Sequence, residues 1–121
     1  MIELSEDAGN AMLDMLAHLM DGGSIELLAD RSERVLAVLR FSSPAAMPAS
    51  GKVLELSQIL EEDSALARGN AAVARILSAG GNEIFSCDVG DLNSAAVIKL
   101  NNTNIAPGGP VRLNSFKVAW P

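Results

Sequence analysis

The sequence is poor in aromatic residues, which make up only 3% of it, and it contains no tyrosine. Proteins that bind bases or sugars stack them on exposed aromatic rings, so this scarcity argues against such a surface. The core must instead be built from aliphatic and methionine side chains, in a sequence whose hydrophobic fraction is 49%. That fraction is enough to offset the entropy of ordering, so we expect a folded chain.

Residues that commonly carry out chemistry are equally scarce. Cys87 is the only cysteine, which excludes an intrachain disulfide and is typical of a reducing compartment. It lies in an apolar strand pattern with nothing nearby to lower its pKa, so we interpret it as a core residue. His18, the only histidine, has no partner motif for metal binding and is interpreted as a surface or boundary residue. We therefore expect no enzyme, no catalytic residue and no cofactor.

Two groups of polar residues are the remaining candidates for a site. Asp88, Asp91 and Asn93 flank a turn, and oxygen ligands on a turn can bind calcium, but their spacing matches no EF-hand loop. The run Glu61-Glu62-Asp63 is typical of a solvated loop. Ordinary turn and surface chemistry accounts for both groups, so we expect no metal site.

The sequence has fewer basic than acidic residues, with nine Lys and Arg against 15 Asp and Glu, and it has no long apolar run. Its formal net charge is -6 and its pI about 4.6, which disfavours binding to phosphate backbones. No apolar run approaches the roughly 18 residues needed to span a membrane. The segment from Met1 to Asp7 has no basic region typical of a signal peptide. We expect a soluble protein made in the cytoplasm, with neither nucleic acid nor a membrane as partner.

The charge is unevenly distributed along the chain. Residues 1–63 contain 12 acidic and four basic residues, whereas residues 64–121 contain three acidic and five basic residues. One interpretation is a bipolar molecule with an acidic docking end. The other is that the charge serves solubility alone.

Residues 5–21 are predicted to form one helix, with Ser5 as the N-cap and Gly22-Gly23 ending it. Its apolar residues recur at helical spacing and predict a buried face covering a sheet. The strand 35–41 is apolar at nearly every position, so we expect both of its faces to be covered, by the opposite sheet and by this helix. The residues that define this face are Ala8, Met12, Met15, Leu16 and Leu19, with Leu13 and Met20 widening it.

After the helix the apolar period changes from that of a helix to that of strands. Residues 57–63 are predicted to form either a helical turn or a loop. In the last predicted strand, the apolar residues Val111 and Leu113 have odd numbers, whereas Phe116, Val118 and Trp120 have even numbers. In a regular strand these two groups would point to opposite faces, so the sequence predicts a β-bulge near Asn114-Ser115. The predicted strands are 24–29, 35–41, 52–56, 71–78, 83–89, 95–100 and 111–120. The expected fold is a single domain over 1–121, mainly β, with an antiparallel jelly-roll-like β-sandwich over about 24–120.

The second half of the chain resembles small virion proteins of tailed bacteriophages. From Val73 to Gly90, an arginine-containing strand leads through a glycine hairpin to an apolar strand that ends in Val-Gly. Asp91-Leu92-Asn93, then Leu100 to Val111 with its Asn-Thr-x-Ile turn and glycine loop, and finally Asn114 to Val118 are similar to the ending of that family. The first helix and strand match more loosely, so the resemblance spans most of the chain and is specific from Val73.

The resemblance implies a jelly-roll sandwich that serves as a capsid decoration, or cement, subunit on the outside of a phage head. The implied partner is the major capsid protein, and the implied localisation is the virion, after synthesis in the host cytoplasm. A shell offers two-fold and three-fold positions, so we expect a homo-oligomer, either a dimer or a trimer. The alternative is a tail, baseplate or fibre-associated module, and a regulatory or chaperone-like binding domain is a further one.

Overall fold

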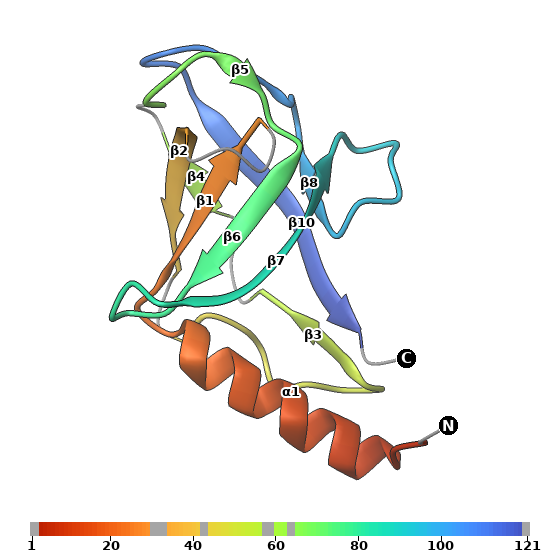
Figure 1. Ribbon diagram of the computed structural model, residues 1–121. Helices are drawn as coiled ribbons and strands as arrows, with labels where there is room; N and C mark the ends of the chain where they lie inside the picture. The colour runs from red at the N-terminus through yellow and green to blue at the C-terminus, as the bar shows by residue number, and fades with distance from the viewer. Residues whose placement is uncertain (1–2, 30–33, 42–43, 57–59, 63–64, 120–121) are drawn as a thin grey trace.

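The computed structural model describes residues 3–29, 34–41, 44–56, 60–62 and 65–119 (Figure 1). In this part of the chain, one N-terminal helix precedes a series of strands that pair almost entirely in antiparallel fashion. These features confirm the predicted fold class. The elements are α1 (Glu6–Met20), β1 (Ser24–Leu28), β2 (Val35–Arg40), β3 (Val53–Glu55), β4 (Leu60–Glu62), β5 (Gly69–Asn70), β6 (Val73–Leu77), β7 (Glu83–Gly90), β8 (Ile98–Leu100), β9 (Asn104–Ile105) and β10 (Val111–Ala119).

Eight of the strands form one sheet in the order β2-β1-β6-β7-β8-β10-β3, and β4 also pairs with β10. The sheet curls so that β4 comes back against β2, and Figure 1 shows β10 passing behind β6 and β7. The N–H groups of Leu66 and Ala67 donate to the carbonyl of Leu36 at 2.8 and 3.2 Å, which covers the edge of β2. The curl brings two halves of the sheet face to face, as in a β-sandwich. Strands β5 and β9 form a separate small sheet.

One continuous hydrophobic core lies between these two halves and under α1. Aliphatic side chains make up most of it, as the composition predicts. Phe116 is buried and meets the ring of Phe85 edge to face, with centroids 6.2 Å apart. Trp120, which the sequence places on the same strand face as Phe116, lies outside the described residues. The largest fully buried side chains are Met20, Ile25, Leu27, Leu28, Leu36, Leu39, Ile76, Ile98, Leu100 and Leu113.

The irregularity predicted for the last strand is confirmed. The pairing of β10 with β8 shifts register between Leu113 and Ser115. Leu113 is buried before the shift and Phe116 after it, although their separation would place them on opposite faces of a regular strand. The bulge therefore keeps both halves of β10 facing the core.

Three expectations about the elements need correction or lie outside the described residues. Strand β4 lies where the sequence allowed only a helical turn or a loop, so neither alternative is right for residues 60–62. Strands β7 and β8 are parallel, pairing Val89 with Ile98 and Gly90 with Lys99. Residues 30–33, which connect the predicted strands 24–29 and 35–41, fall outside the described residues.

The expected position of the helix is also wrong. Helix α1 packs mainly against β3, not against the strand 35–41. That strand is β2, and its residues Leu36 and Leu39 are buried in the core beside β1. The curl of the sheet covers these side chains, so the expected cover by the opposite sheet is right and only the cover by the helix is wrong.

The acidic first half and the basic second half of the chain interleave in the sheet. Three cross-strand pairs each join an acid from residues 1–63 to a base from residues 64–121. They are Glu26 with Arg75 at 3.0 Å, Glu61 with Arg112 at 3.5 Å and Glu55 with Lys117 at 3.6 Å. The sheet is therefore not bipolar, and the uneven charge of the sequence does not become a separation of charge within it.

Candidate docking surface on the N-terminal helix

Helix α1 begins and ends where the sequence predicts. The hydroxyl of Ser5 accepts the N–H of Ala8 at 3.1 Å, and Glu6 and Asp7 lie in the first turn, near the positive end of the helix dipole. After Asp21, Gly22 adopts a φ of 74°, which glycine accepts without a steric penalty. A Cβ on Gly23 would collide with the carbonyl oxygen of Leu77, so this glycine lets the chain pass close to β6.

One side of the helix is buried. Gly9, Leu13 and Met20 are buried and Leu16 is half-buried, at the helical spacing i, i+4, i+7 and i+11. A Cβ at Gly9 would lie 2.6 Å from Cγ of Lys52. The glycine therefore admits the aliphatic stem of Lys52 against the helix, while Nζ of this lysine donates to the carbonyl of Leu4 at 3.4 Å.

An adjacent side of the helix holds the segment 45–52 by a row of hydrogen bonds, which we call the polar ladder. Each bond runs from a backbone N–H of the segment to a side-chain oxygen of the helix or its cap. The donors and acceptors are Ala45 to Asp21 at 2.7 Å, Ala49 to Asp14 at 2.7 Å, Gly51 to Glu6 at 3.2 Å and Lys52 to Asn10 at 2.8 Å. Several of the helix's acids thus serve the fold itself, a role that the sequence does not reveal.

The segment in the ladder is one arm of a tight hairpin with β3. Ser50 and Val53 exchange both backbone hydrogen bonds, at 3.1 and 3.0 Å. Gly51 and Lys52 between them both have a φ of 61°, the conformation that a two-residue hairpin of this kind requires. The ladder supplies acceptors for the N–H groups of both residues, which compensates for the left-handed backbone at Lys52.

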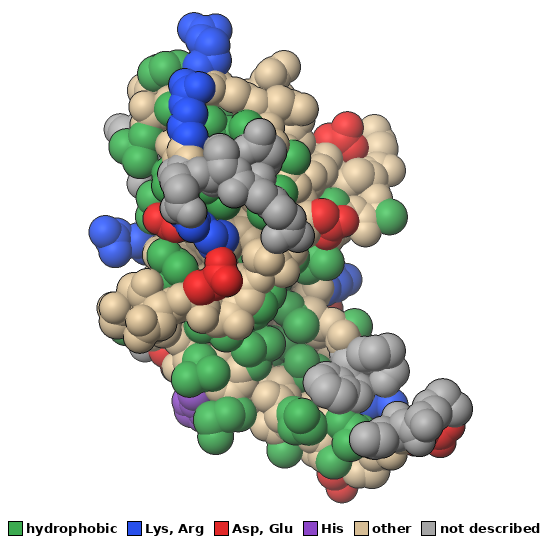
Figure 2. Space-filling view, in the orientation of Figure 1, with side chains coloured by type: hydrophobic (Ala, Val, Ile, Leu, Met, Phe, Trp, Pro, Cys, Tyr) green, Lys and Arg blue, Asp and Glu red, His purple; other side chains and the backbone are tan. Residues whose placement is uncertain are grey.

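The third side of the helix is apolar and exposed. Met12, Met15 and Leu19 are 48%, 61% and 51% exposed, and we call these three residues the apolar stripe. Figure 2 shows hydrophobic side chains gathered along α1. The sequence prediction that these residues face the core is therefore wrong, because the neighbouring side of the helix does so instead. Contiguous exposed apolar groups are typical of interaction surfaces.

Periodicity alone could not have separated the two apolar sides. Ala8, Met12, Met15 and Leu19 have the same spacing as Gly9, Leu13, Leu16 and Met20, displaced by one residue. The pattern that distinguishes the buried apolar side from the exposed one is a row of polar residues. Glu6, Asn10 and Asp14 also recur at a spacing of four, and they lie next to the buried side and opposite the apolar stripe.

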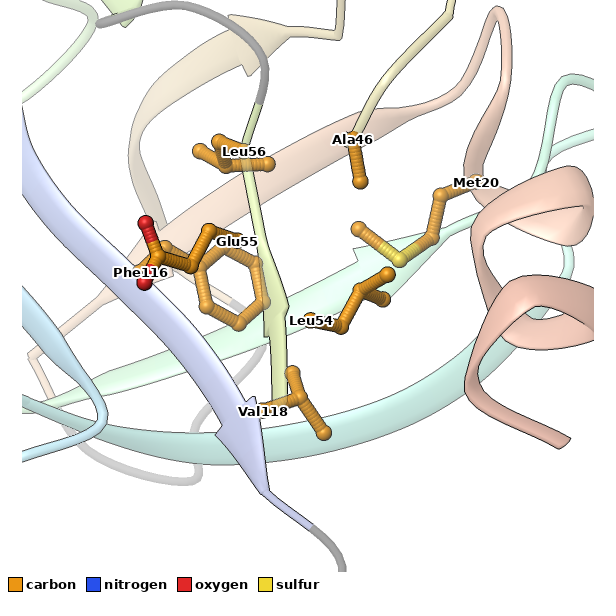
Figure 3. Close-up of a pocket in the computed structure, with 7 residues that line it drawn as sticks. All are labelled: Met20, Ala46, Leu54, Glu55, Leu56, Phe116 and Val118. Carbon is orange, nitrogen blue, oxygen red and sulfur yellow. The ribbon is translucent and has the colours of Figure 1, made fainter. Parts of the chain in front are cut away.

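An apolar pocket lies where the C-terminal end of the helix meets the sheet (Figure 3). Its lining residues include Met20, Leu54, Phe116 and Val118, with Glu55 the only charged one. A wider groove of about 290 Å³ runs between α1 and the arm that contains Pro44, Met47 and Pro48. The groove is also lined by Asp14, His18 and Asp21. Two of these side chains, Asp14 and Asp21, already accept the N–H groups of Ala49 and Ala45.

The candidate calcium ligands are engaged in turn chemistry. The Asp91 side chain accepts the N–H of Asn93 at 3.0 Å, and the Asp88 side chain accepts that of Val97 at 2.9 Å. Over the ranges that the structure describes, no group of three or more His, Cys, Asp or Glu side chains could hold a metal ion. In the run 61–63, Glu61 is exposed in β4 and pairs with Arg112, and Asp63 lies outside the described residues.

The single histidine is exposed to solvent, whereas the single cysteine is partly buried. The His18 side chain is 75% exposed, with Nδ1 3.9 Å from the carboxylate of Asp21. Cys87 packs against the core from β7, and its burial, with a smaller contribution from the charge of Asp88, raises the pKa of its thiol to about 12. These positions agree with the interpretation of His18 as a surface residue and of Cys87 as a core residue.

None of the helices in the described part of the chain combines the length and apolar character of a membrane span. Comparison with known proteins found no matching family model, no matching curated protein and no matching solved structure.

Proposed function

We propose that this chain is a structural virion protein without catalytic activity, a decoration subunit that binds the outside of a tailed-phage head and stabilises the shell. The observation that carries the proposal is the apolar stripe on α1, with Met12, Met15 and Leu19 each about half exposed. A binding module needs such a surface and needs no active site. The resemblance of the second half of the chain to virion proteins supplies the setting.

In this proposal the curled sheet is a rigid platform and α1 is the docking element. The polar ladder and the buried Leu13 and Met20 fix the helix on the sheet, so the apolar stripe is pre-organised and little entropy is lost on binding. The partner is the major capsid protein, and the subunit forms a dimer or a trimer at a symmetric position of the shell. A tail, baseplate or fibre-associated module is the alternative, since it needs the same kind of surface.

The test is the number of copies of this chain in purified particles, measured by quantitative mass spectrometry against the major shell protein. A ratio near one, or another simple fraction set by shell symmetry, is the expected result. A few copies per particle would move the protein to the tail. Absence from the particles would end the virion proposal.

A further inference from the structure

We propose that the groove between α1 and the arm 44–48 binds an extended segment of another protein, one that carries two basic residues three positions apart. This inference goes beyond the proposed function, because the groove lies on the polar-ladder side of the helix and depends neither on the apolar stripe nor on a phage particle. The groove has a volume of about 290 Å³. Its wall is mostly apolar, and the apolar part consists of Ala17, Pro44, Ala46, Met47 and Pro48.

Two carboxylates, those of Asp14 and Asp21, lie in this groove and can accept further donors. Each uses its Oδ1 atom for one backbone N–H of the arm, from Ala49 and Ala45 respectively, at 2.7 Å. A carboxylate has room for about four hydrogen bonds. Both side chains are partly buried, so salt screens their attraction for a cation less than it would at a fully exposed site.

The cations of the described ranges leave both carboxylates without a Lys or Arg partner. Lys52 packs on the same helix but at its other end, where its Nζ atom donates to the carbonyl of Leu4 at 3.4 Å. His18 lies closer, with Nδ1 3.9 Å from Oδ2 of Asp21, which is longer than a hydrogen bond. A basic group entering the groove therefore gains attraction without displacing an existing ion pair.

The spacing of the carboxylates indicates the form of the occupant. Asp14 and Asp21 are seven residues apart, which is about 10.5 Å along a helix at 1.5 Å per residue. An extended chain covers about 10 Å in three residues, so lysine or arginine at that spacing can meet both acids. Met47, which is 47% exposed, and the two prolines of the arm offer apolar surface to the aliphatic stems of such side chains.

The test is an NMR titration of the full chain with a six-residue peptide that has lysine at its second and fifth positions and threonine elsewhere. The amide signals of Ala45 and Ala49 should shift, because these N–H groups donate to the two carboxylates, and added salt should weaken binding. A peptide with glutamate at the same positions should not bind, and one with adjacent lysines should bind more weakly. Equal binding of the three peptides, or binding that leaves both signals unmoved, would overturn the proposal.

The double variant D14N/D21N removes both charges and keeps an oxygen for each N–H of the arm. It should bind the lysine peptide about tenfold more weakly than the parent chain. The matched control is E3Q/E83Q, which loses the same charge at two exposed positions that do not line the groove. Equal binding by the two double variants would show a general attraction to an acidic protein, and the proposal would be wrong.

Met47→Lys tests the groove without changing the polar ladder. It places a cation in the wall beside the two acids, so it should melt like the parent chain and bind the lysine peptide about tenfold more weakly. Leu92→Lys is its control, because Leu92 is similarly exposed, at 52%, in the loop after β7. Equal binding by these two variants contradicts the proposal. So does a dimer of the parent chain that Met47→Lys disperses in analytical ultracentrifugation, because the groove would then hold a second copy.

Discussion

Cys87 has a thiol that is held in its neutral form. It packs against the core from β7, and its pKa is raised from 9.0 to about 12. The main cause is that burial removes water from around the thiolate, and the negative charge of Asp88 adds to this effect. The residue is therefore a poor nucleophile at neutral pH.

The native chain should react slowly with iodoacetamide. Because only the thiolate reacts, and the pKa is raised from 9.0 to about 12, we expect alkylation at pH 8 to be slower by at least about tenfold in the folded than in the unfolded chain. Mass spectrometry after timed quenching measures both rates, and alkylation in urea is the control. Similar rates in the two states would show that Cys87 is accessible and readily ionised.

The same shift makes stability depend on pH. Between pH 9.0 and about 12 the unfolded chain loses the thiol proton while the folded chain keeps it. The stabilisation is thus complete below pH 9 and is lost as the pH rises through this range. The melting temperature of the native chain should fall more steeply above pH 9 than that of Cys87→Val, which has no thiol. Parallel curves would contradict the shift.

At the scale of elements, the polar ladder connects α1 to the hairpin that the segment 45–52 forms with β3. Its most instructive member is Asp14, whose carboxylate accepts the partly buried N–H of Ala49 at 2.7 Å. Hydrogen bonds to charged groups are the stronger ones, and an N–H that loses its acceptor keeps the cost of desolvation.

Asp14→Ala should therefore lower the free energy of unfolding by about 1–3 kcal/mol. Asp14→Asn keeps an oxygen at the same position and should lose less than half of that amount. Urea denaturation of the three proteins gives the comparison. If alanine and asparagine are equivalent at this position, the hydrogen bond to Ala49 contributes nothing and the ladder does not hold the hairpin.

Local patterns in the sequence predict most of the elements. Ser5 and Gly22 mark the ends of α1, and the parity change after Leu113 predicts the bulge in β10, because both signals involve residues close together in the chain. Strand β4 escapes prediction because only three of its residues pair, all of them with the distant β10. The parallel contact of β7 with β8 covers only two residue pairs, too short to leave a pattern.

The candidate site is less predictable than the fold. The sequence shows that α1 has apolar and acidic residues, but it does not show which apolar side meets the sheet. That choice depends on the hairpin, whose backbone N–H groups need the acceptors Asn10 and Asp14. The position of the hairpin is set in turn by the pairing of β3 with β10, more than 60 residues later in the chain.

At the scale of the whole molecule, helix and sheet share one core. Leu13 and Met20 of α1 belong to the same cluster as the inward residues of the strands. We therefore expect the helix and the sheet to unfold together, as one cooperative unit.

Leu13→Ala should lower the free energy of unfolding by about 2–4 kcal/mol, because Leu13 is only 3% exposed. Met15→Ala, on the same helix but 61% exposed, should change it by less than about 0.5 kcal/mol. Far-UV circular dichroism and Cys87 labelling in urea should give the same midpoint for each protein. A variant whose helix signal is lost while Cys87 stays protected would show that the helix is a separate unit.

The direction of the polar ladder has a mechanical consequence. Its four hydrogen bonds are spread along the length of α1, from Glu6 to Asp21. They hold the helix to a hairpin whose second arm, β3, pairs with β10. A force applied along the helix axis loads these bonds together, in shear, whereas a force that lifts one end of the helix breaks them one after another. The attachment is therefore strong against sliding and weak against peeling, so a load carried by α1 is best resisted when it acts along the helix.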